Sequence, residues 1–173
     1  MAELRGSPEG QAWLAWLFDN DITVVDVGST TAYNTGTDTL FLASDADATS
    51  LVHEATHAQW DLAGNNVDVT AVSREEYITN RLDGEVNSMV AEVRYLQATT
   101  EDPSTVSDQA FIDYTRAQAE ALASGATPEE ADGAGRAAIR ELYTSGYYSP
   151  GNVNDDETTY MDYYGEYWDL YNP

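Results

Sequence analysis

The two histidines of this 173-residue chain flank a short segment that contains a glutamate, so that His53, Glu54 and His57 lie within five positions. On an α-helix, side chains four positions apart project from the same face, and His53 and His57 can therefore bind one metal ion together. Glu54 then reaches a water molecule on that metal and can act on it as a general base. Two incidental histidines on a surface helix are the alternative. Because the chain has 2 histidines in total and places both in this pattern, the spacing favours a zinc site.

A catalytic zinc ion takes three protein ligands and leaves a fourth position for water. The chain has no cysteine and no further histidine, so the third ligand must be a carboxylate or, rarely, a tyrosine. Glu85 fits by helical phase, because it falls on the apolar stripe of a helix expected over 72–98. That stripe consists of Ile78, Leu82, Met89 and Leu96. An isolated carboxylate there is costly unless it is paired or bound to a metal, so we predict Glu85 as the third ligand.

Other carboxylates remain open as alternatives for this ligand. Glu92 lies on the same stripe two turns later, where it can be the ligand or can hold a ligating histidine by a hydrogen bond. Glu75 and Glu76 lie near the start of the same helix, where the helix dipole alone favours acidic residues. Asp61, one turn past His57, and Asp68 are more distant candidates.

The elements around the motif predict an α+β fold that is mainly helical. The motif helix should begin at a cap formed by Ser44 or Asp47 and run to about residue 62. Two strand-like segments precede it, the first of them β-branched, and predict a small N-terminal antiparallel sheet. These segments are 22–27 and 39–43, and further helices are expected from Ser7, over 72–98, 107–124 and 128–144, and after a cap at Asp155–Glu157. We expect one domain over 1–173, with the N-terminal helix and strands in 1–45, the active-site helices in 46–98 and the C-terminal helices and tyrosine-rich tail in 105–173.

The composition excludes several classes of function. The chain carries 31 acidic and 7 basic residues, a net charge of −24, whereas a nucleic-acid-binding protein needs a basic surface. An anionic membrane surface would repel the chain as well. The chain contains no run of 18 apolar residues and no basic start followed by an apolar stretch. We therefore expect a soluble monomer, exported, if at all, without a visible signal peptide, whose acidity serves solvation in salt, solubility or the attraction of cationic substrates.

The His-Glu-x-x-His motif on a helix after a strand resembles the zincin metallopeptidases. A downstream helix that supplies Glu85 is similar to the gluzincin branch, whereas Trp60 and Ala63 stand where the metzincin extension needs glycine and histidine. The segment 39–42 looks like the edge strand that binds extended substrates in zincins. This resemblance covers about residues 39–97. It implies zinc-dependent hydrolysis of peptide bonds in a peptide or protein substrate, with Glu54 as the general base.

A looser resemblance extends over the rest of the chain. The segments 51–60 and 81–85 and the tyrosine-rich end look like small metallopeptidase domains of bacterial exported or toxin-like proteins. In zincins a tyrosine or histidine often steadies the oxyanion of the tetrahedral intermediate. Since no histidine remains, the resemblance assigns this role to Tyr160 and Tyr164. The alternative for any one of these tyrosines is a ring packed on the core with its hydroxyl in water.

A second class of function competes with the enzyme. A non-catalytic, metal-stabilised acidic domain could use the same motif as a structural site and recognise a partner through its aromatic C-terminal segment. A third interpretation, an acidic interaction protein without metal, rests on the net charge alone.

The metal content of the purified protein is the first quantity to measure. Because His57 supplies one of two imidazole ligands, we expect about one zinc per chain in the wild type and none in His57→Ala, as determined by elemental analysis. A wild-type protein that takes up no zinc, even when zinc is added, would remove the enzyme interpretation.

Overall fold

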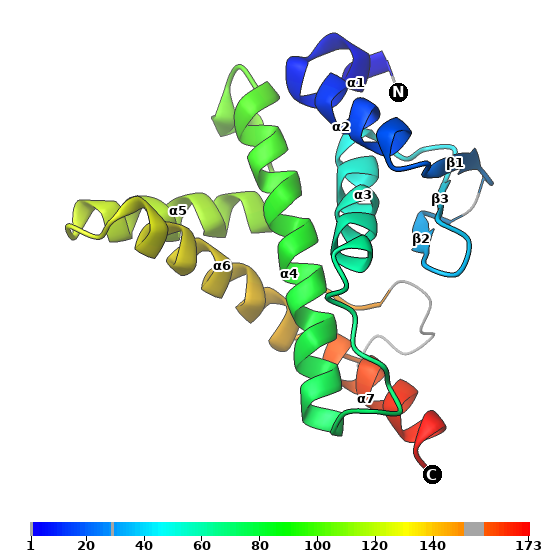
Figure 1. Cartoon of the computed structure of the whole chain (residues 1–173). Coiled ribbons are helices and arrows are strands. Elements are labelled where there is room, and N and C mark those ends of the chain that lie inside the picture. The colour runs from blue at the N-terminus through cyan, green and yellow to red at the C-terminus, as the bar shows by residue number, and fades with distance from the viewer. Residues whose placement is uncertain (1, 29, 151–157) are drawn as a thin grey trace. The chain divides into compact units, whose positions relative to one another are not determined.

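The computed structural model describes residues 2–28, 30–150 and 158–173. The fold is mainly helical with a small three-stranded N-terminal sheet, which confirms the predicted α+β class (Figure 1). The helices are α1 (Ala2–Gly6), α2 (Pro8–Asp19), α3 (Ala48–Leu62), α4 (Arg74–Thr99), the short 3-10 turn η1 (Pro103–Thr105), α5 (Gln109–Ala123), α6 (Pro128–Thr144) and α7 (Tyr160–Tyr171). The strands are β1 (Thr23–Asp26), β2 (Ala32–Asn34) and β3 (Thr39–Leu42).

The chain forms two compact units. The first comprises Met1–Gly64 and Ser88–Thr105, and the second comprises Asn65–Asn87 and Val106–Pro173. The division falls within α4, so this one helix contributes its second half to the first unit and its first half to the second. The expectation of a single domain over 1–173 stays a prediction.

The sheet of the first unit is mixed, in the order β1-β3-β2. A tight turn makes β2 and β3 an antiparallel hairpin, with Tyr33 opposite Leu40, and Asp38 in this turn has a φ of 46°. The chain also reverses between β1 and β2, beginning at Gly28 with a φ of 82°, a conformation that glycine adopts without strain. Two reversals leave β1 parallel to β3, with Thr23 opposite Thr39. The prediction that 39–43 is antiparallel to 22–27 is therefore wrong, because the three-residue β2 lies between them in the chain.

Helix α3 carries the histidine motif and packs against α2, β2 and β3. Asp47 is its N-cap, since one carboxylate oxygen accepts from the Ser50 N–H at 2.8 Å, and Gly64 follows its end with a φ of 72°. The inward face of α3 is small and aliphatic, which lets the helix lie close to the sheet. The buried core of the first unit contains Leu4, Leu17, Ile22, Leu40, Leu42, Ala48, Leu51, Val52, Ala55, Ala58 and Tyr95. Burial of this face leaves the half-buried motif side chains on the other side of α3.

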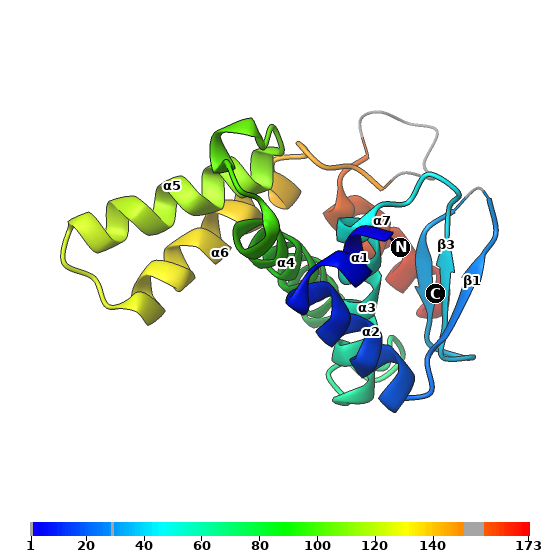
Figure 2. The same ribbon diagram turned by 90° about the horizontal axis from the view of Figure 1, so that it is seen from above.

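Helices α5 and α6 of the second unit form an antiparallel hairpin and lie side by side in both views (Figures 1 and 2). Helix α6 begins with a capping box, in which Thr127 and Glu130 bind each other's backbone N–H groups. Gly135 allows the close approach of the two helices. A β-carbon at this position would lie 2.5 Å from the ring of Tyr114, which is 1% exposed.

Helix α7 ends the chain and is anchored to the segment that precedes α4. The Trp168 indole N–H donates to the Val72 carbonyl at 3.0 Å, and the Asn172 amide donates to the Val69 carbonyl at 3.0 Å. The N-cap of α7 is Thr159. The predicted cap at 155–157 lies outside the described residues.

The Gly135 contact gives a stability prediction with a matched control in the same helix. Gly-to-Ala substitution inside a helix normally stabilises by about 1 kcal/mol, as expected for Gly133→Ala, where a β-carbon meets no atom within 4 Å. Gly135→Ala should instead lower the free energy of unfolding by about 1–3 kcal/mol, because the added β-carbon would overlap the buried ring of Tyr114. Urea denaturation measures both. Equal stabilisation by the two substitutions would contradict the packing described for α5 and α6.

Candidate metal centre

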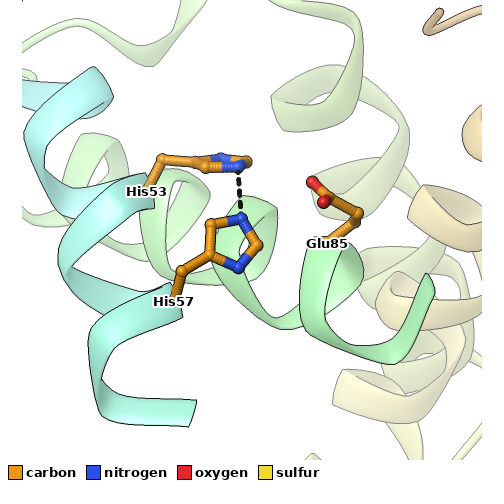
Figure 3. Close-up of side chains that lie close together, drawn as sticks. All are labelled: His53, His57 and Glu85. Atoms are coloured by element: carbon orange, nitrogen blue, oxygen red, sulfur yellow. Dashed lines mark hydrogen bonds between the residues drawn. The ribbon is translucent and has the colours of Figure 1, made fainter. Parts of the chain in front are cut away.

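Three predicted ligands offer donor atoms to one place. His53 and His57 on α3 and Glu85 on α4 each present a ligand atom, and these atoms all lie within 4.8 Å of one another. Figure 3 shows the two imidazoles of α3 close together and the Glu85 carboxylate directed toward them. The group could hold a metal ion.

The two imidazoles face each other through the same ring nitrogen. His53 Nε2 lies 3.1 Å from His57 Nε2, and the ring planes are inclined at 67°. Two lone pairs at this distance repel each other unless a proton or a metal ion lies between them. Ligand nitrogens at about 2.0–2.1 Å from a tetrahedral zinc ion are separated by about 3.3 Å, so the observed spacing fits two ligands of one metal.

Glu92 fixes the orientation of His53. Its Oε1 accepts a hydrogen bond from His53 Nδ1 at 2.5 Å, within the first unit. A neutral imidazole carries one proton, so a proton on Nδ1 leaves the lone pair on Nε2. Of the two roles considered for Glu92, the structure therefore contains the hydrogen bond to a candidate ligand, an arrangement that is common around metal-bound histidines.

Glu85 is one of the few buried charged side chains among the described residues, with 7% exposure. Its Oε1 accepts a hydrogen bond from the Tyr164 hydroxyl at 2.5 Å, and both residues belong to the second unit. Burial raises the pKa of the Tyr164 phenol well above its ordinary value, and the neighbouring Glu85 raises it further. The phenol therefore stays protonated and donates a hydrogen bond to the carboxylate. The Arg81 guanidinium lies 5.3 Å from the centre of the Tyr164 ring, as a cation–π partner.

Glu54 is held by the backbone of a strand. Its Oε2 accepts a hydrogen bond from the Tyr33 N–H at 2.8 Å, which directs that N–H away from β3 and toward α3. Tyr33 lies on β2, at one edge of the sheet, whereas β3 is paired on both sides. The expectation that 39–42 is an edge strand is therefore wrong. The strand beside the motif is β2, which was too short to stand out as a strand in the sequence.

The other carboxylates considered as ligands have different partners. Asp61 lies 3.4 Å from the Tyr33 hydroxyl, whose pKa is raised by burial and by the neighbouring Asp38 and Asp61. Asp68 and Glu76 are exposed, and hydrogen bonds from nearby hydroxyl and backbone N–H groups lower the pKa of each. Glu75 is exposed in the first turn of α4. Of the candidate carboxylates, Glu85 is the one grouped with the two histidines, with its ligand oxygen within 4.8 Å of a ligand nitrogen of each.

The two tyrosines expected to steady an oxyanion lie on α7. Tyr164 contacts Glu85, and the Tyr160 ring lies 5.9 Å from the Tyr164 ring and 5.0 Å from that of Tyr143. Their predicted catalytic role stays a prediction. Sequence reasoning missed the Tyr33 N–H, because a backbone donor has no signature in residue type. It also missed Arg81, although its place one turn before Glu85 on α4 pointed toward the same group.

Comparison of the chain with protein-family models, curated proteins and solved structures finds no match. The resemblance to zincins therefore rests on the motif and on the group of His53, His57 and Glu85. In the part of the chain that the structure describes, every helix is too short or too polar to span a lipid bilayer.

The hydrogen bond of Glu92 predicts an effect on metal affinity. Glu92→Gln removes the carboxylate that orients His53, so we expect zinc affinity to fall about 10- to 100-fold while the fold is kept. Competition with a chromophoric chelator measures the affinity, and circular dichroism reports the fold. Glu75→Gln, an exposed change on the same helix, is the control, and equal affinities for both variants would rule out this role.

Proposed function

We propose that the chain is a zinc-dependent hydrolase of peptide bonds. The observation that carries the proposal is the convergence of the His53, His57 and Glu85 ligand atoms within 4.8 Å, with Glu54 adjacent to His53 on the same helix. Two imidazole nitrogens and one carboxylate oxygen are a known donor set of catalytic zinc, and this set leaves a position for water.

The chemistry of the donor set supports zinc among the metals. Imidazole and carboxylate together suit zinc, whereas calcium and magnesium prefer sites built from oxygen ligands alone. Glu85 is buried, and a carboxylate removed from water needs a compensating positive charge or hydrogen bonds. The Tyr164 hydroxyl and the positive charge of Arg81 supply part of this compensation, and a bound cation would add to it.

In the proposed hydrolysis, the metal ion, Glu54 and the Tyr33 N–H have different roles. When bound, zinc acts as a Lewis acid and lowers the pKa of a water molecule to about 7. Glu54 is the general base, and the Tyr33 N–H holds its Oε2 at 2.8 Å. Its other oxygen, Oε1, then accepts the proton of the attacking water and passes it to the leaving nitrogen. Because the backbone fixes one oxygen of this carboxylate, the general base keeps its orientation through the proton transfer.

The substrate class follows from two observations. The peptide bond as target is supported by the resemblance of the His-Glu-x-x-His motif to zincins. A net charge of −24 favours neutral or cationic peptides over acidic ones, because an acidic surface repels an acidic substrate.

A non-catalytic, metal-stabilised binding domain is the second candidate, and the outer face of α7 favours it. Tyr163, Tyr167, Leu170 and Tyr171 are exposed there, and exposed aromatic groups of this kind occur at protein-binding surfaces. Removal of zinc by a chelator separates the two candidates. In an enzyme the chelator abolishes hydrolysis, whereas in a binding domain it lowers only the melting temperature.

Glu54→Gln tests catalysis directly. The substitution keeps the shape of the side chain and removes the base, so peptide hydrolysis should fall at least about 100-fold while zinc content and circular dichroism stay at the wild-type level. Internally quenched peptide libraries with neutral and basic sequences report the activity. Glu101→Gln, at an exposed position beyond the end of α4, is the matched control. Near-complete activity in Glu54→Gln would refute the proposed mechanism.

A further inference from the structure

We propose that Tyr164 is a positioning residue for Glu85, so that the C-terminal helix α7 completes the candidate metal centre. The inference rests on the proposed function, because it gives Tyr164 a role only where Glu85 binds a metal. It assigns Tyr164 a task other than the oxyanion contact expected from the sequence, and it makes metal binding depend on the last helix of the chain.

A hydrogen bond joins Tyr164 to Glu85. The Tyr164 hydroxyl donates to Glu85 Oε1, and 79 residues separate the two in the chain. A carboxylate that is free to rotate presents either oxygen, or both, to a metal ion. Occupation of Oε1 by a buried phenol fixes the rotation of the group and directs the other oxygen to the ligand position.

The Tyr164 ring is itself held in place by its neighbours. The side chain is 6% exposed, and the Arg81 guanidinium lies 5.3 Å from its ring centre. The Tyr77 ring meets it edge-on, with centroids 6.5 Å apart and an interplanar angle of 86°. Arg81 and Tyr77 both lie on α4, at one and two turns before Glu85, so the helix that carries the ligand also holds the phenol.

Helix α7 is tied both to the first residue of α4 and to the segment that precedes this helix. Besides the bonds from Trp168 and Asn172 to backbone carbonyls, Arg74 pairs with Asp169 at 3.2 Å. The Arg74 guanidinium lies directly over Gly165, which has no side chain in its way. These contacts set the position of α7 along α4 and thereby place the Tyr164 hydroxyl at Glu85.

The same geometry argues against an oxyanion contact from Tyr164. A phenol has one hydroxyl proton to donate, and this proton is directed at Glu85 Oε1. Donation to a substrate oxygen would require Tyr164 to release Glu85. The hydrogen bond from Tyr164 to Glu85 instead suits a role in orienting the candidate metal ligand.

A double-mutant cycle with Zn²⁺ alone as the probe tests the inference. We expect Tyr164→Phe to raise the zinc Kd about 10- to 100-fold, as measured by competition with a chromophoric chelator, with helical circular dichroism retained. Tyr147→Phe, at an exposed tyrosine of the same unit outside α7, should leave the Kd unchanged. In a Glu85→Ala background, Tyr164→Phe should change the Kd less than twofold, because the carboxylate through which it acts is gone.

The outcomes are distinguishable. Equal Kd values for Tyr164→Phe and wild type would overturn the inference and leave the proposed function intact. An equal loss in both backgrounds would also overturn it, because the phenol would then act on the fold and not through Glu85. A wild-type protein that binds no zinc would overturn the proposed function together with the inference.

A measurement on the wild type covers the case in which Tyr164→Phe does not fold. Coupling is reciprocal, so a helix that supports the metal ligand is itself supported by the metal. Zinc should therefore slow amide hydrogen exchange in α7 more than in α5, which belongs to the same unit and carries none of the three candidate ligands. Equal slowing of α5 and α7 by bound zinc would contradict the role of Tyr164.

Discussion

A nearly buried carboxylate must be compensated, and this requirement on Glu85 links the elements around the candidate centre. The apolar face of α4 removes the side chain from water. Compensation comes from the Tyr164 hydroxyl on α7 and, in the proposed function, from a metal ion shared with His53 and His57. The helix presents a candidate ligand at the cost of a buried charge, which partners on other elements compensate.

Two motif side chains of α3, His53 and Glu54, are oriented by neighbours outside the helix. Glu92 binds His53 on the side away from the ligand nitrogen, and the Tyr33 N–H of β2 binds Glu54. Neither contact adds a ligand or a base, but each removes a rotation that would otherwise be lost on metal or substrate binding. The contribution of the small sheet to the motif is thus one backbone donor, the Tyr33 N–H that binds Glu54. The α+β architecture gives the motif helix an edge strand on which its glutamate rests.

Periodic features of the sequence predicted the candidate metal group, whereas strand pairing and the docking of α7, which depend on packing, could not be predicted from it. The motif spacing and the phase of Glu85 follow from 3.6 residues per turn, so the group of His53, His57 and Glu85 was accessible from the chain alone. Parallel pairing of β1 with β3 was not, because the three residues of β2 are too few to show alternation. The bond from Tyr164 to Glu85 spans 79 residues and depends on how α7 docks, which no local pattern records. The cap of α7 at Thr159 was missed because acidic residues just before it offered an equally good local signal.

Helix α4 also sets the distance and the relative orientation of two carboxylates, Glu85 and Glu92. Glu85 and Glu92 are seven residues apart on one unbroken helix, which places them on nearly the same face and about 10.5 Å apart along the axis. Insertion or deletion of a single residue between them would rotate one carboxylate by about 100° relative to the other. The candidate ligand and the partner of His53 would then no longer serve the same centre. Substitution of the side chains between these two positions would keep this spacing, whereas a change in the number of residues between them would not.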